Sequence, residues 1–542
     1  MSTPNELRRR TGRLARRWPV AGRTVAALAA GLLLFAAFPP GRNWWAAPLG
    51  VAVLVVVVTG RRARAGFWYG FVAGAGFCIP LLVWIDEMVG AAPWLGLAIV
   101  CALYYGVFGA VAARVAHVRG GPLWVASAWV TAEWARSSVP FGGFPWGRLA
   151  FSQADGPLLP IAHYLGAPGI SFAVALVGAG LAALARAAVS GRTLRLHWRI
   201  VVAPCLAVLL PLGAAIAALP AVHGSGPGPT VTVAAIQGDV PRLGYNFTTQ
   251  REAVLDNHLA ETQRLAADIA AGRATRPDVV IWPENSSDIP PENVPEAGAR
   301  ISAASVAVGA PILVGTVHWA ADGQHYFNSM IMWDARGAGE RHDKAILQPF
   351  GETMPMRSFF RHFSHYVDYA SNFSKGHGDG VVHPGSGPMP RLPIGVATCY
   401  EVAFDRAFQQ SVAAGAQILT VPTNNATFGH SNMTWQQLGM SRIRAVEFDR
   451  EVVVAATTGV SALVRPDGVV TAHTATWTPA YLEATVPLRS TRTPASRLGW
   501  WVQGVLLVLT AVGLAAGIRH DRGSARAIPP AAKPTPTAEE AT

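Results

Sequence analysis

Three residues, Glu284, Lys344 and Cys399, have side chains that together can carry out acyl transfer. Cys399 ends a β-like run, IGVATC, and is followed by Tyr400 and Glu401. In α/β folds, the turn after a strand exposes catalytic side chains. A cysteine attacks as its thiolate, which needs a base and a positive neighbour. Glu284 ends the run VVIWPE and Lys344 lies in HDKAIL, so these two residues can supply the base and the cation.

Each of these residues also has an ordinary structural explanation. A single cysteine is often a small buried hydrophobic residue, a glutamate after an apolar run is often a cap or turn residue, and Lys344 alone is typical of a solvated loop. Glu401 is also compatible with an acid at a helix start, where the helix dipole favours it. The other cysteines, Cys78, Cys101 and Cys205, lie in apolar runs, and no CxxC or Cys/His metal spacing occurs. We therefore expect no disulfide in the block around Cys399, no metal and no cofactor.

The segment from residue 229 to residue 488, which contains all three candidates, alternates β-like and helical runs. The β-like runs are Val231–Gln237, Val279–Trp282, Pro311–Val317, Ser329–Trp333, Ile394–Cys399, Ile418–Val421, Val452–Ala456 and Ala462–Arg465. Helical spacing occurs in Arg251–Ala271, Ala403–Ala414 and Met433–Asp449. Strands separated by helices, with several adjacent strand pairs, predict a mixed sheet covered by helices. The preceding stretch GSGPGP is typical of a linker.

The rest of the chain is too apolar for a plain soluble enzyme. Hydrophobic residues make up 51% of the chain and charged residues 14%, whereas soluble domains carry about 25% charged residues. The same apolar content excludes disorder. The net charge of +12 is uneven, because residues 1–228 contain 19 Arg, no Lys and five acidic residues, and the remaining 25 basic and 27 acidic residues give −2. A basic half that is apolar between its Arg clusters indicates a membrane protein more than a nucleic-acid-binding one.

Eight apolar runs are candidate membrane spans, since a hydrocarbon core about 30 Å thick needs roughly 20 apolar residues per helix. They are Val20–Phe38, Trp45–Thr59, Gly66–Ile85, Ala91–Ala113, Pro122–Trp134, Leu158–Ala188, Ile200–Leu219 and Leu498–Ile518. Arg clusters fall on alternate loops, which by the positive-inside rule places both termini in the cytoplasm and residues 229–488 outside it. We expect most other Trp and Arg residues to be interfacial anchors. A cleaved signal peptide is the competing explanation of the first run.

The ordered motifs around the three candidates resemble those of the apolipoprotein N-acyltransferase family, a branch of the carbon–nitrogen hydrolase (nitrilase) superfamily. In the C-terminal half they are Trp282-Pro283-Glu284, Lys344 with Pro349-Phe350-Gly351-Glu352, Cys399-Tyr400-Glu401 with Phe404, Asn424–Gly429, Arg444-Ala445-Val446-Glu447 and Thr457–Ala462. In the apolar half they are Glu133-Trp134-x-Arg136, Gly143-Phe144-Pro145-Trp146 and Ser152-Gln153. The Arg- and Ala-rich composition and His342-Asp343-Lys344 indicate an actinobacterial-type member.

The resemblance covers nearly the whole chain and implies a fold: a polytopic α-helical membrane bundle of about eight spans plus an α/β nitrilase-like αββα sandwich. We expect residues 1–19 to be a cytoplasmic segment, 20–220 a seven-span membrane domain and 229–488 an extracytoplasmic catalytic domain. Residues 498–518 would form the final transmembrane helix, and 519–542, rich in Pro, Ala and Thr, a disordered cytoplasmic tail. The implied location is the cell membrane, with several passes.

The resemblance also implies a ping-pong reaction with a cysteine thioester. Glu284 would act as base, Cys399 as nucleophile and Lys344 as oxyanion stabiliser, and the pKa of Glu284 would be tuned by nearby groups. Glu352 would orient the Glu284–Lys344 pair, while Tyr400 and Glu401 would position the nucleophile and the loop after it.

The implied partners are lipids of the membrane. A phospholipid would be the acyl donor, and the α-amine of a diacylglyceryl-cysteine at an apolipoprotein N-terminus the acceptor. No nucleic acid is implied. A separate lipid-linked glycosyltransferase is a further implied partner. Some relatives carry a lipid-linked sugar synthase as a fused domain, and we expect none here because only 24 residues follow the last expected span.

Two departures from the family pattern concern the acyl pocket. Thr427 stands where the family often has Trp, and Tyr245 is the nearest aromatic residue to the place where the family has a Trp after the first strand of the catalytic block.

Two other functions compete with acyl transfer. A membrane-anchored amidase or nitrile hydrolase would use the same three residues with water as acceptor. A transporter or a non-enzymatic scaffold would need ionisable residues inside its spans, and these hold almost none apart from Glu133.

Overall fold

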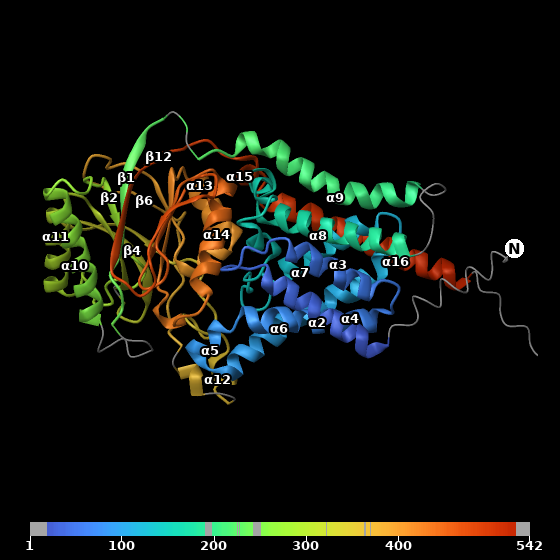
Figure 1. The fold of residues 1–542 in the computed structure, drawn as a ribbon. Coiled ribbons are helices and arrows are strands. Elements are labelled where there is room, and N and C mark those ends of the chain that lie inside the picture. The colour runs from blue at the N-terminus through green and yellow to red at the C-terminus, as the bar shows by residue number, and fades with distance from the viewer. Residues whose placement is uncertain are drawn as a thin grey trace, which may run out of the picture.

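The computed structural model describes residues 19–526, except 190–197, 225, 227, 242–250, 321, 363, 364 and 369. Figure 1 shows an elongated molecule in which a helical bundle occupies one half and an α/β block the other. From the far end of the block inward, the order is helices α10 and α11, the two sheets, helices α13 and α14, and then the bundle.

The helical half contains a helix at each of the eight expected apolar runs. They are α2 (Val20–Ala36), α3 (Ala46–Val58), α4 (Ala63–Leu81), α6 (Ala91–Val115), α7 (Gly121–Arg136), α8 (Ala162–Val189), α9 (Trp198–Ala218) and α16 (Trp500–Arg526). Within the described residues, four stretches are long and apolar enough to cross a membrane: Ala91–Val115, Leu159–Val189, Val201–Ala221 and Trp500–Arg522. Two shorter apolar helices are α2 and α3. The structure therefore has several apolar helices of spanning type.

Short elements connect these helices to one another and to the block. They are α5 (Trp84–Val89), η1 (Leu149–Gln153), η2 (Leu159–Ile161), η3 (Leu219–Ala221) and α15 (Pro494–Leu498). The segment from residue 137 to residue 148, between α7 and η1, has no regular helix, and it contains Gly142, Gly143 and Gly147 with positive φ angles. This segment, called here the bridging loop, lies where the bundle meets the α/β block.

The α/β block consists of two six-stranded sheets. The first has the order β12-β1-β2-β3-β4-β5 and the second β11-β10-β9-β8-β7-β6. The strands of the first sheet are β1 (Thr230–Gln237), β2 (Val279–Ile281), β3 (Ile312–Trp319), β4 (Tyr326–Asp334), β5 (Gly337–Asp343) and β12 (Ala480–Pro487). Those of the second are β6 (Val381–Val382), β7 (Ile394–Val396), β8 (Ile418–Thr423), β9 (Val452–Ala456), β10 (Ala462–Val464) and β11 (Val470–His473).

Each sheet pairs its central strands in parallel and its outer strands antiparallel. In the first sheet β1, β2 and β3 are parallel neighbours, and in the second sheet β7, β8 and β9 are. Parallel strands are connected by helices, which is why α11 (Pro295–Val308) joins β2 to β3 and α14 (Met433–Phe448) joins β8 to β9. Among the described residues, the remaining helices of the block are α10 (Arg251–Ala270), α12 (Arg357–Phe360), η5 (His365–Asp368), η6 (Cys399–Ala403), α13 (Asp405–Ala413) and η7 (Ala426–Phe428).

Three buried apolar clusters hold these layers together. One lies between the two sheets and includes Val233, Ile281, Ile394 and Val453. A second packs α10 and α11 on the outer face of the first sheet. The third runs without a break from the bundle into α13 and α14 on the outer face of the second sheet. The block is thus an αββα sandwich whose inner helix layer is shared with the bundle.

The expected strand Ile394–Cys399 is too long, because β7 ends at Val396. Thr398 and Glu401 form a capping box that starts the 3₁₀ helix η6 at Cys399. Helix α11 and strands β5, β6, β11 and β12 were not expected; their apolar residues are too few or too irregularly spaced to give a periodic signal. The other expected strands and helices of the block occur within a few residues of their predicted bounds.

Candidate active site

Glu284 lies just beyond the carboxyl end of β2, in the segment Trp282-Pro283-Glu284. Pro283 ends the strand because it cannot donate to the ladder. The neighbouring β3 has Gly315 at this level, where a Cβ would overlap the carbonyl of Pro283 and the Cα of Glu284. The missing side chain therefore lets the Glu284 segment approach β3 closely. The Glu284 carboxylate is buried, with 4% of the residue exposed.

Lys344 follows β5 directly and joins two carboxylates. Its Nζ donates to Oε1 of Glu284 at 2.9 Å and to Oε1 of Glu352 at 2.8 Å. Asn328 on β4 bridges the same two oxygens, with its Nδ2 at 2.7 Å from Glu284 and 2.8 Å from Glu352. The remaining oxygen of Glu284 accepts the backbone N–H of Asn424 at 3.0 Å. Two carboxylates, one ammonium and one amide thus form a closed, buried cluster.

Cys399 lies at the first position of η6, on a sharp turn after β7. Its φ of 50° is in the left-handed region, which is uncommon outside glycine. Such a conformation at a nucleophile is typical of a strained strand-to-helix turn that directs the side chain away from the sheet. Cys399 is 5% exposed. The thiol therefore lies at the end of a parallel strand, in the second sheet, opposite the Glu284 cluster from the first.

The charges around Cys399 have opposing effects on its thiol. Burial and the Glu284 carboxylate raise the pKa of Cys399 to about 12, although Lys344 and a hydrogen bond with Thr423 act in the lowering direction. The thiol is consequently protonated at neutral pH until a base removes its proton. Burial lowers the pKa of Lys344, but the Glu284 and Glu352 carboxylates outweigh this, and its pKa lies well above the ordinary value. Lys344 therefore stays a cation beside the thiol.

Glu352 carries the second carboxylate of the cluster. Burial raises its pKa above the ordinary value, against the lowering effect of the Lys344 ammonium. Its Oε2 accepts the backbone N–H of Gln348 at 2.8 Å, so the same residue holds the ammonium and closes the loop that follows it.

Glu401 ties the Lys344 loop to the Cys399 loop. Its Oε1 accepts the backbone N–H groups of Ala345 at 3.0 Å and Ile346 at 2.8 Å, and its Oε2 accepts that of Thr398 at 2.8 Å. Burial opposes its charge, but His342 and these donors outweigh burial, so the pKa of Glu401 lies below its ordinary value. Glu401 is therefore a helix-start acid, as the dipole explanation predicts, and in addition a cross-link between two loops.

Tyr400 ties the Cys399 loop to the helical half. Its hydroxyl donates to the carbonyl of Gly143 at 3.0 Å, and its ring stacks on Phe144 with centroids 6.2 Å apart. Gly143 has a φ of 83°, and a Cβ there would overlap the backbone of Ser137. The bridging loop thus reaches the residue next to the nucleophile.

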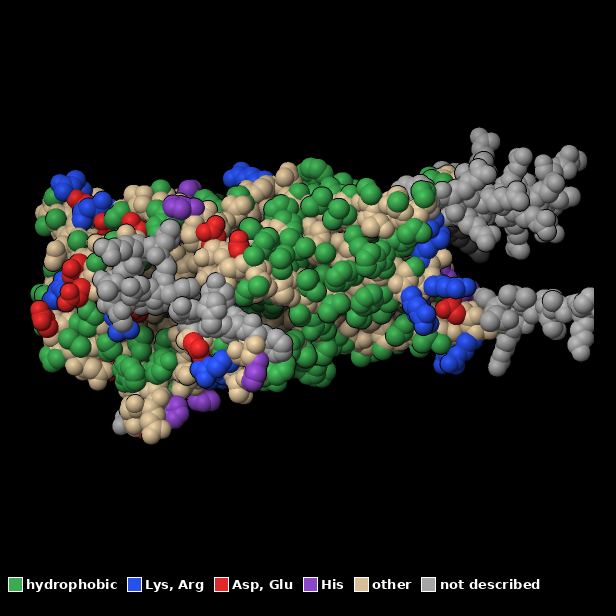
Figure 2. Space-filling view, turned by 90° about the horizontal axis from the view of Figure 1, so that it is seen from below, with side chains coloured by type: hydrophobic (Ala, Val, Ile, Leu, Met, Phe, Trp, Pro, Cys, Tyr) green, Lys and Arg blue, Asp and Glu red, His purple; other side chains and the backbone are tan. Residues whose placement is uncertain are grey.

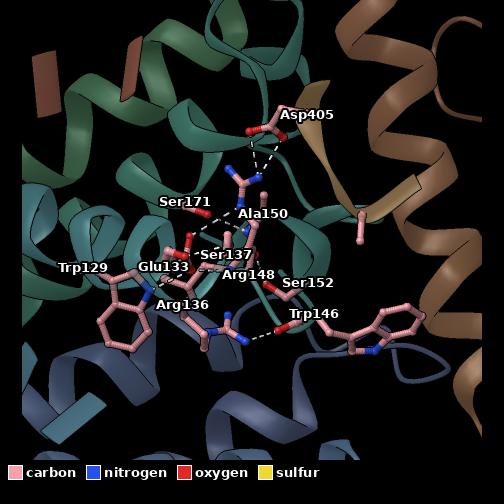
Figure 3. A network of polar contacts seen from close by, with 12 residues as sticks. Trp129, Glu133, Arg136, Ser137, Trp146, Arg148, Ala150, Ser152, Ser171 and Asp405 are labelled. Atoms are coloured by element: carbon pink, nitrogen blue, oxygen red, sulfur yellow. Dashed lines mark hydrogen bonds and ion pairs between the residues drawn. The ribbon is translucent and has the colours of Figure 1, made fainter. Parts of the chain in front are cut away.

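A buried ionic network continues this connection (Figure 3). Arg148 of the bridging loop donates to both oxygens of Asp405 at 2.7 and 2.9 Å, and its Nε lies 3.9 Å from Glu133 of α7. Glu133 Oε1 accepts from Trp129 Nε1 at 2.9 Å and from the backbone of Leu149 at 2.7 Å. Asp405 opens α13, six residues after Cys399.

Arg444 of α14 holds the same region from the other side. Its Nη1 donates to Asp405 at 2.8 Å and pairs with Glu447, while its Nε and Nη2 donate to the carbonyls of Val402 and Ala403 at 2.9 and 3.1 Å. The backbone that follows Cys399 is thus fixed by hydrogen bonds from α14 on one side and, through Asp405, by the bridging loop on the other.

The structure brings all six residues singled out from the sequence, Glu284, Lys344, Cys399, Glu352, Tyr400 and Glu401, into one region. Asn328, Thr423 and Gly315 are neighbours that sequence reasoning missed. A polar Asn inside an apolar strand is a signal that could have identified Asn328, because Asn is depleted in strands. Within the described residues, no group of three or more His, Cys, Asp or Glu side chains could hold a metal ion.

Several Trp and Arg residues of the helical half are not interfacial anchors. Trp129, Trp146 and Arg148 are at most 2% exposed, because the ionic network and α14 cover them; Trp146 Nε1 donates to Gln436 of α14 at 2.6 Å. Anchoring was expected for most, not all, of the Trp and Arg residues, and these three are exceptions to it. Thr427 lies in η7, whose Phe428 packs edge-on against Trp84 with centroids 5.1 Å apart. Tyr245 lies outside the described residues.

Comparisons with known proteins agree with this architecture. Residues 30–180 match the model of the apolipoprotein N-acyltransferase N-terminal domain, and residues 232–494 that of the carbon–nitrogen hydrolases. The apolipoprotein N-acyltransferase of Mycolicibacterium smegmatis is 47% identical over 92% of this chain and 85% of that protein. The chain belongs to the apolipoprotein N-acyltransferase family.

More distant relatives show the same coverage. The apolipoprotein N-acyltransferase of Ralstonia nicotianae is 31% identical over 90% of this chain and 93% of its own length. Among solved structures, an amidase of the nitrilase superfamily from Nesterenkonia is 18% identical, covers 48% of this chain and 92% of that chain, and has a TM-score of 0.35; so low a score adds nothing to the assignment. This family member is therefore an acyltransferase with a nitrilase-like block and apolar membrane helices.

Proposed function

We propose that this protein transfers a fatty acyl group from a membrane phospholipid to the α-amine of the N-terminal diacylglyceryl-cysteine of apolipoproteins. The observation that carries the proposal is the position of the Glu284–Lys344–Cys399 cluster. The cluster is buried, and its Cys399 lies on the loop that opens η6, called here the nucleophile loop. Tyr400 connects this loop to the bridging loop of the helical half. An acyl donor anchored in a bilayer needs this proximity of thiol and membrane segment.

The first half-reaction forms an acyl-enzyme. Glu284 removes the proton from the Cys399 thiol, and the thiolate attacks the carbonyl carbon of a phospholipid ester. The carbonyl oxygen becomes an oxyanion, which the Lys344 ammonium stabilises by charge and hydrogen bonding. When the carbon–oxygen bond of the ester breaks, the leaving lysophospholipid oxygen takes the proton back from Glu284. Cys399 then holds the acyl chain as a thioester.

The second half-reaction releases the product. The α-amine of the acceptor attacks the thioester carbonyl, and Lys344 again faces the oxyanion. Glu284 takes the proton that the amine loses as it becomes an amide, and the Cys399 thiolate leaves and is reprotonated. Because burial and the Glu284 carboxylate raise the pKa of the thiol to about 12, the thiolate forms only when a base such as Glu284 takes its proton.

The supporting residues act through position. Glu352 shares the Lys344 ammonium with Glu284 and so keeps Lys344 charged. Glu401 fixes the distance between the Lys344 and Cys399 loops by accepting three backbone N–H groups. Tyr400 fixes the position of the nucleophile loop relative to the bridging loop through its hydrogen bond to Gly143. Their assignment as positioning residues follows from these contacts.

We infer an eight-span topology with both termini in the cytoplasm. The α/β block, residues 229–488, would lie outside the cytoplasm, after a seven-span domain of residues 20–220 and before a last span at 498–518. Figure 2 supports this orientation: a broad hydrophobic surface covers the helical half, and Lys and Arg side chains gather at its end far from the block. Positive charge marks the cytoplasmic side of membrane proteins.

The experiment that tests the function uses the purified protein with phospholipid vesicles and a synthetic diacylated lipopeptide. N-acylated lipopeptide detected by mass spectrometry, together with equimolar lysophospholipid, is the expected result. Release of free fatty acid without N-acylation would instead support the hydrolase that uses water as acceptor. Cys399→Ala protein serves as the control, since it keeps the fold but lacks the nucleophile.

A further inference from the structure

A cavity of about 320 Å³ opens beside the catalytic cluster. Its lining comes from the bridging loop at Phe141–Gly143, from the segment after Lys344 between Ala345 and Thr353, from Phe373 and Lys375, and from the segment that begins at Tyr400 and ends at Arg406. Its walls therefore include the sequence neighbours of both Lys344 and Cys399. A molecule in this cavity contacts the segments that follow Lys344 and Cys399 and the bridging loop of the helical half.

The charged residues of the lining are two cations, Lys375 and Arg406, and the lining includes no acidic residue. Both side chains are exposed, and within the described residues neither makes an ion pair or hydrogen bond with a carboxylate. Arg406 lies over the ring of Phe404, its guanidinium carbon 4.7 Å from the centroid. A guanidinium stacked on a ring keeps its N–H groups in the ring-parallel plane, free to donate.

The nearby carboxylates are already engaged, so they do not neutralise these cations. Asp405, next to Arg406 in sequence, is paired with Arg148 and Arg444, and Glu352 holds Lys344. Lys375 is itself held close to the catalytic cluster, because the backbone N–H of Gly376 donates to the carbonyl of Lys344 at 2.9 Å. Two unneutralised cations thus lie at one cavity whose other wall residues are mainly apolar.

The lipid side of this cavity is marked by exposed aromatic rings. Phe141, which lines the cavity, contacts Phe350 and Phe360 edge-on, with centroids 5.6 and 6.4 Å apart. Phe141 and Phe350 are each about two-fifths exposed. Exposed apolar rings next to an apolar helical surface can enter the boundary between headgroups and acyl chains, as Trp, Phe and Leu side chains of interfacial helices do. The two cations are therefore placed at the level of headgroups rather than of acyl chains.

From this arrangement we propose that Lys375 and Arg406 bind the phosphate of the donor glycerophospholipid and that the site favours donors with a net negative headgroup. The inference rests on the proposed phospholipid donor. The glycerol backbone keeps the ester carbonyl a few bonds from the phosphate, so a phosphate at the two cations leaves the ester free to reach Cys399. The single negative charge of one phosphodiester does not neutralise both cations. A headgroup with its own ammonium adds a third positive charge, which the two cations repel.

The test compares three donors, phosphatidylglycerol, phosphatidylethanolamine and phosphatidylcholine. Each is the sole reactive lipid in vesicles whose other components are the same. The variants are Lys375→Gln, Arg406→Gln and the double variant. The matched control is Arg391→Gln, which changes an exposed arginine that does not line this cavity. The readouts are kcat/KM for lipopeptide N-acylation and the burst of p-nitrophenolate from a short-chain p-nitrophenyl ester, a donor without phosphate.

We expect the wild-type protein to prefer phosphatidylglycerol. The double variant should lose about tenfold in kcat/KM with that lipid, as expected for a lost charge-assisted contact. The ratio of its kcat/KM values for two different headgroups should approach one. The burst from the p-nitrophenyl ester should be unchanged in every variant. Arg391→Gln should behave as wild type in all assays.

Two results would overturn the proposal: an unchanged headgroup preference in the double variant, or an equal loss with the phosphate-free ester. Inorganic phosphate at constant ionic strength tests the other source of this anion: inhibition that the double variant abolishes, together with a headgroup preference that the double variant leaves unchanged, would assign the cations to a free anion instead. If the wild-type protein N-acylates the lipopeptide with none of the three phospholipids but still gives the p-nitrophenolate burst, a phospholipid is not the donor. This outcome differs from a loss of headgroup selectivity.

Discussion

Cys399 is poorly nucleophilic by itself because it is buried next to a carboxylate. The combination of a raised thiol pKa and an adjacent Glu284–Lys344 pair differs from cysteine sites in which a positive neighbour alone makes a stable thiolate. A thiol that stays protonated until a base takes its proton is less prone to oxidation than a stable thiolate. Burial also limits access of water to the thioester that forms there.

Replacing the nucleophile should abolish transfer without unfolding the protein. Cys399→Ala removes the attacking atom, and Cys399→Ser leaves a hydroxyl whose proton Glu284 removes much less readily; we expect lipopeptide N-acylation below detection in both. The wild-type acyl-enzyme should be released by neutral hydroxylamine, which cleaves thioesters. Thermal unfolding in detergent should remain within about 1 kcal/mol of wild type, since one small buried atom changes. Full transfer by Cys399→Ala would disprove the assignment.

The Glu401 carboxylate makes the free energy of unfolding depend on pH. Its pKa is below the ordinary value in the folded state, so its contribution is fully present above about pH 4.5 and is lost as the pH falls through the lower folded value. Glu401→Gln should cost about 1–3 kcal/mol at pH 7, because neutral acceptors hold three backbone N–H groups less strongly. It should also flatten the loss of stability in acid. Unfolding midpoints between pH 3 and pH 7 measure both effects, and parallel curves for variant and wild type would contradict this role.

At the scale of elements, the bridging loop determines how the nucleophile loop meets the helical half. It contributes the carbonyl that accepts from Tyr400, the guanidinium that pairs with Asp405, and part of the cavity lining. Its backbone follows this path because Gly142, Gly143 and Gly147 adopt positive φ angles. A loop of ordinary residues would not bring its backbone so close to η6.

Gly143→Ala should lower activity more than stability. The Cβ would overlap the backbone of Ser137 and strain a left-handed residue, so the loop must shift and the hydrogen bond from Tyr400 lengthens. We expect kcat for N-acylation to fall at least tenfold, with an unfolding midpoint lowered by a few degrees. The control is Gly142→Ala, which has the same backbone strain but no atom within 4 Å of the added methyl. Equal activities of the two variants would argue against the bridging role.

At the scale of the whole molecule, the α/β block and the bundle share one buried cluster and one ionic network. Helix α14 packs on the second sheet with one face and on α8 with another, and its Arg444 reaches Asp405, which Arg148 holds from the bundle side. The two halves are therefore expected to unfold as a coupled unit, unlike a soluble enzyme on a flexible tether.

Arg148→Ala tests this coupling. The substitution leaves the buried Glu133 without its Arg148 partner and the part-buried Asp405 with Arg444, and breaking a buried ion pair costs about 3–5 kcal/mol. We expect a lower unfolding midpoint in detergent and reduced N-acylation even though Arg148 does not touch the catalytic cluster. Arg391→Ala, at an exposed position, should be neutral. Near-wild-type stability of Arg148→Ala would show that the network is not structurally important.

The proposed topology predicts which side of the membrane each loop faces. Glu296→Cys on α11 and Arg119→Cys between α6 and α7 both place a thiol at an exposed position. In spheroplasts, a membrane-impermeant maleimide should label Glu296→Cys directly and Arg119→Cys only after permeabilisation. The protein with its four native cysteines is the background control, since three are buried. The reverse labelling pattern would invert the topology.

Local signals in the sequence were sufficient to propose the chemistry and to predict most elements. The candidate triad could be proposed because each member lies within a short motif, and the eight apolar helices could be predicted because hydrophobic runs of this length have few alternatives. Strands such as Val231–Gln237 and Val452–Ala456 were found because they are continuous and β-branched. Elements with weak periodicity, such as β5 (GAGERHD) and β12, could not be found in this way.

The sequence by itself therefore yields the candidate reactive residues and the division into an apolar basic half and a neutral block. Only the tertiary structure decided how these parts meet, because the deciding contacts join residues far apart in the chain: Tyr400 and Gly143 are 257 positions apart, and Trp146 and Gln436 are 290. Asn328 became a partner of Glu284 only when β4 paired with β3. Such contacts depend on packing and on the pairing of buried polar groups, which no local pattern encodes.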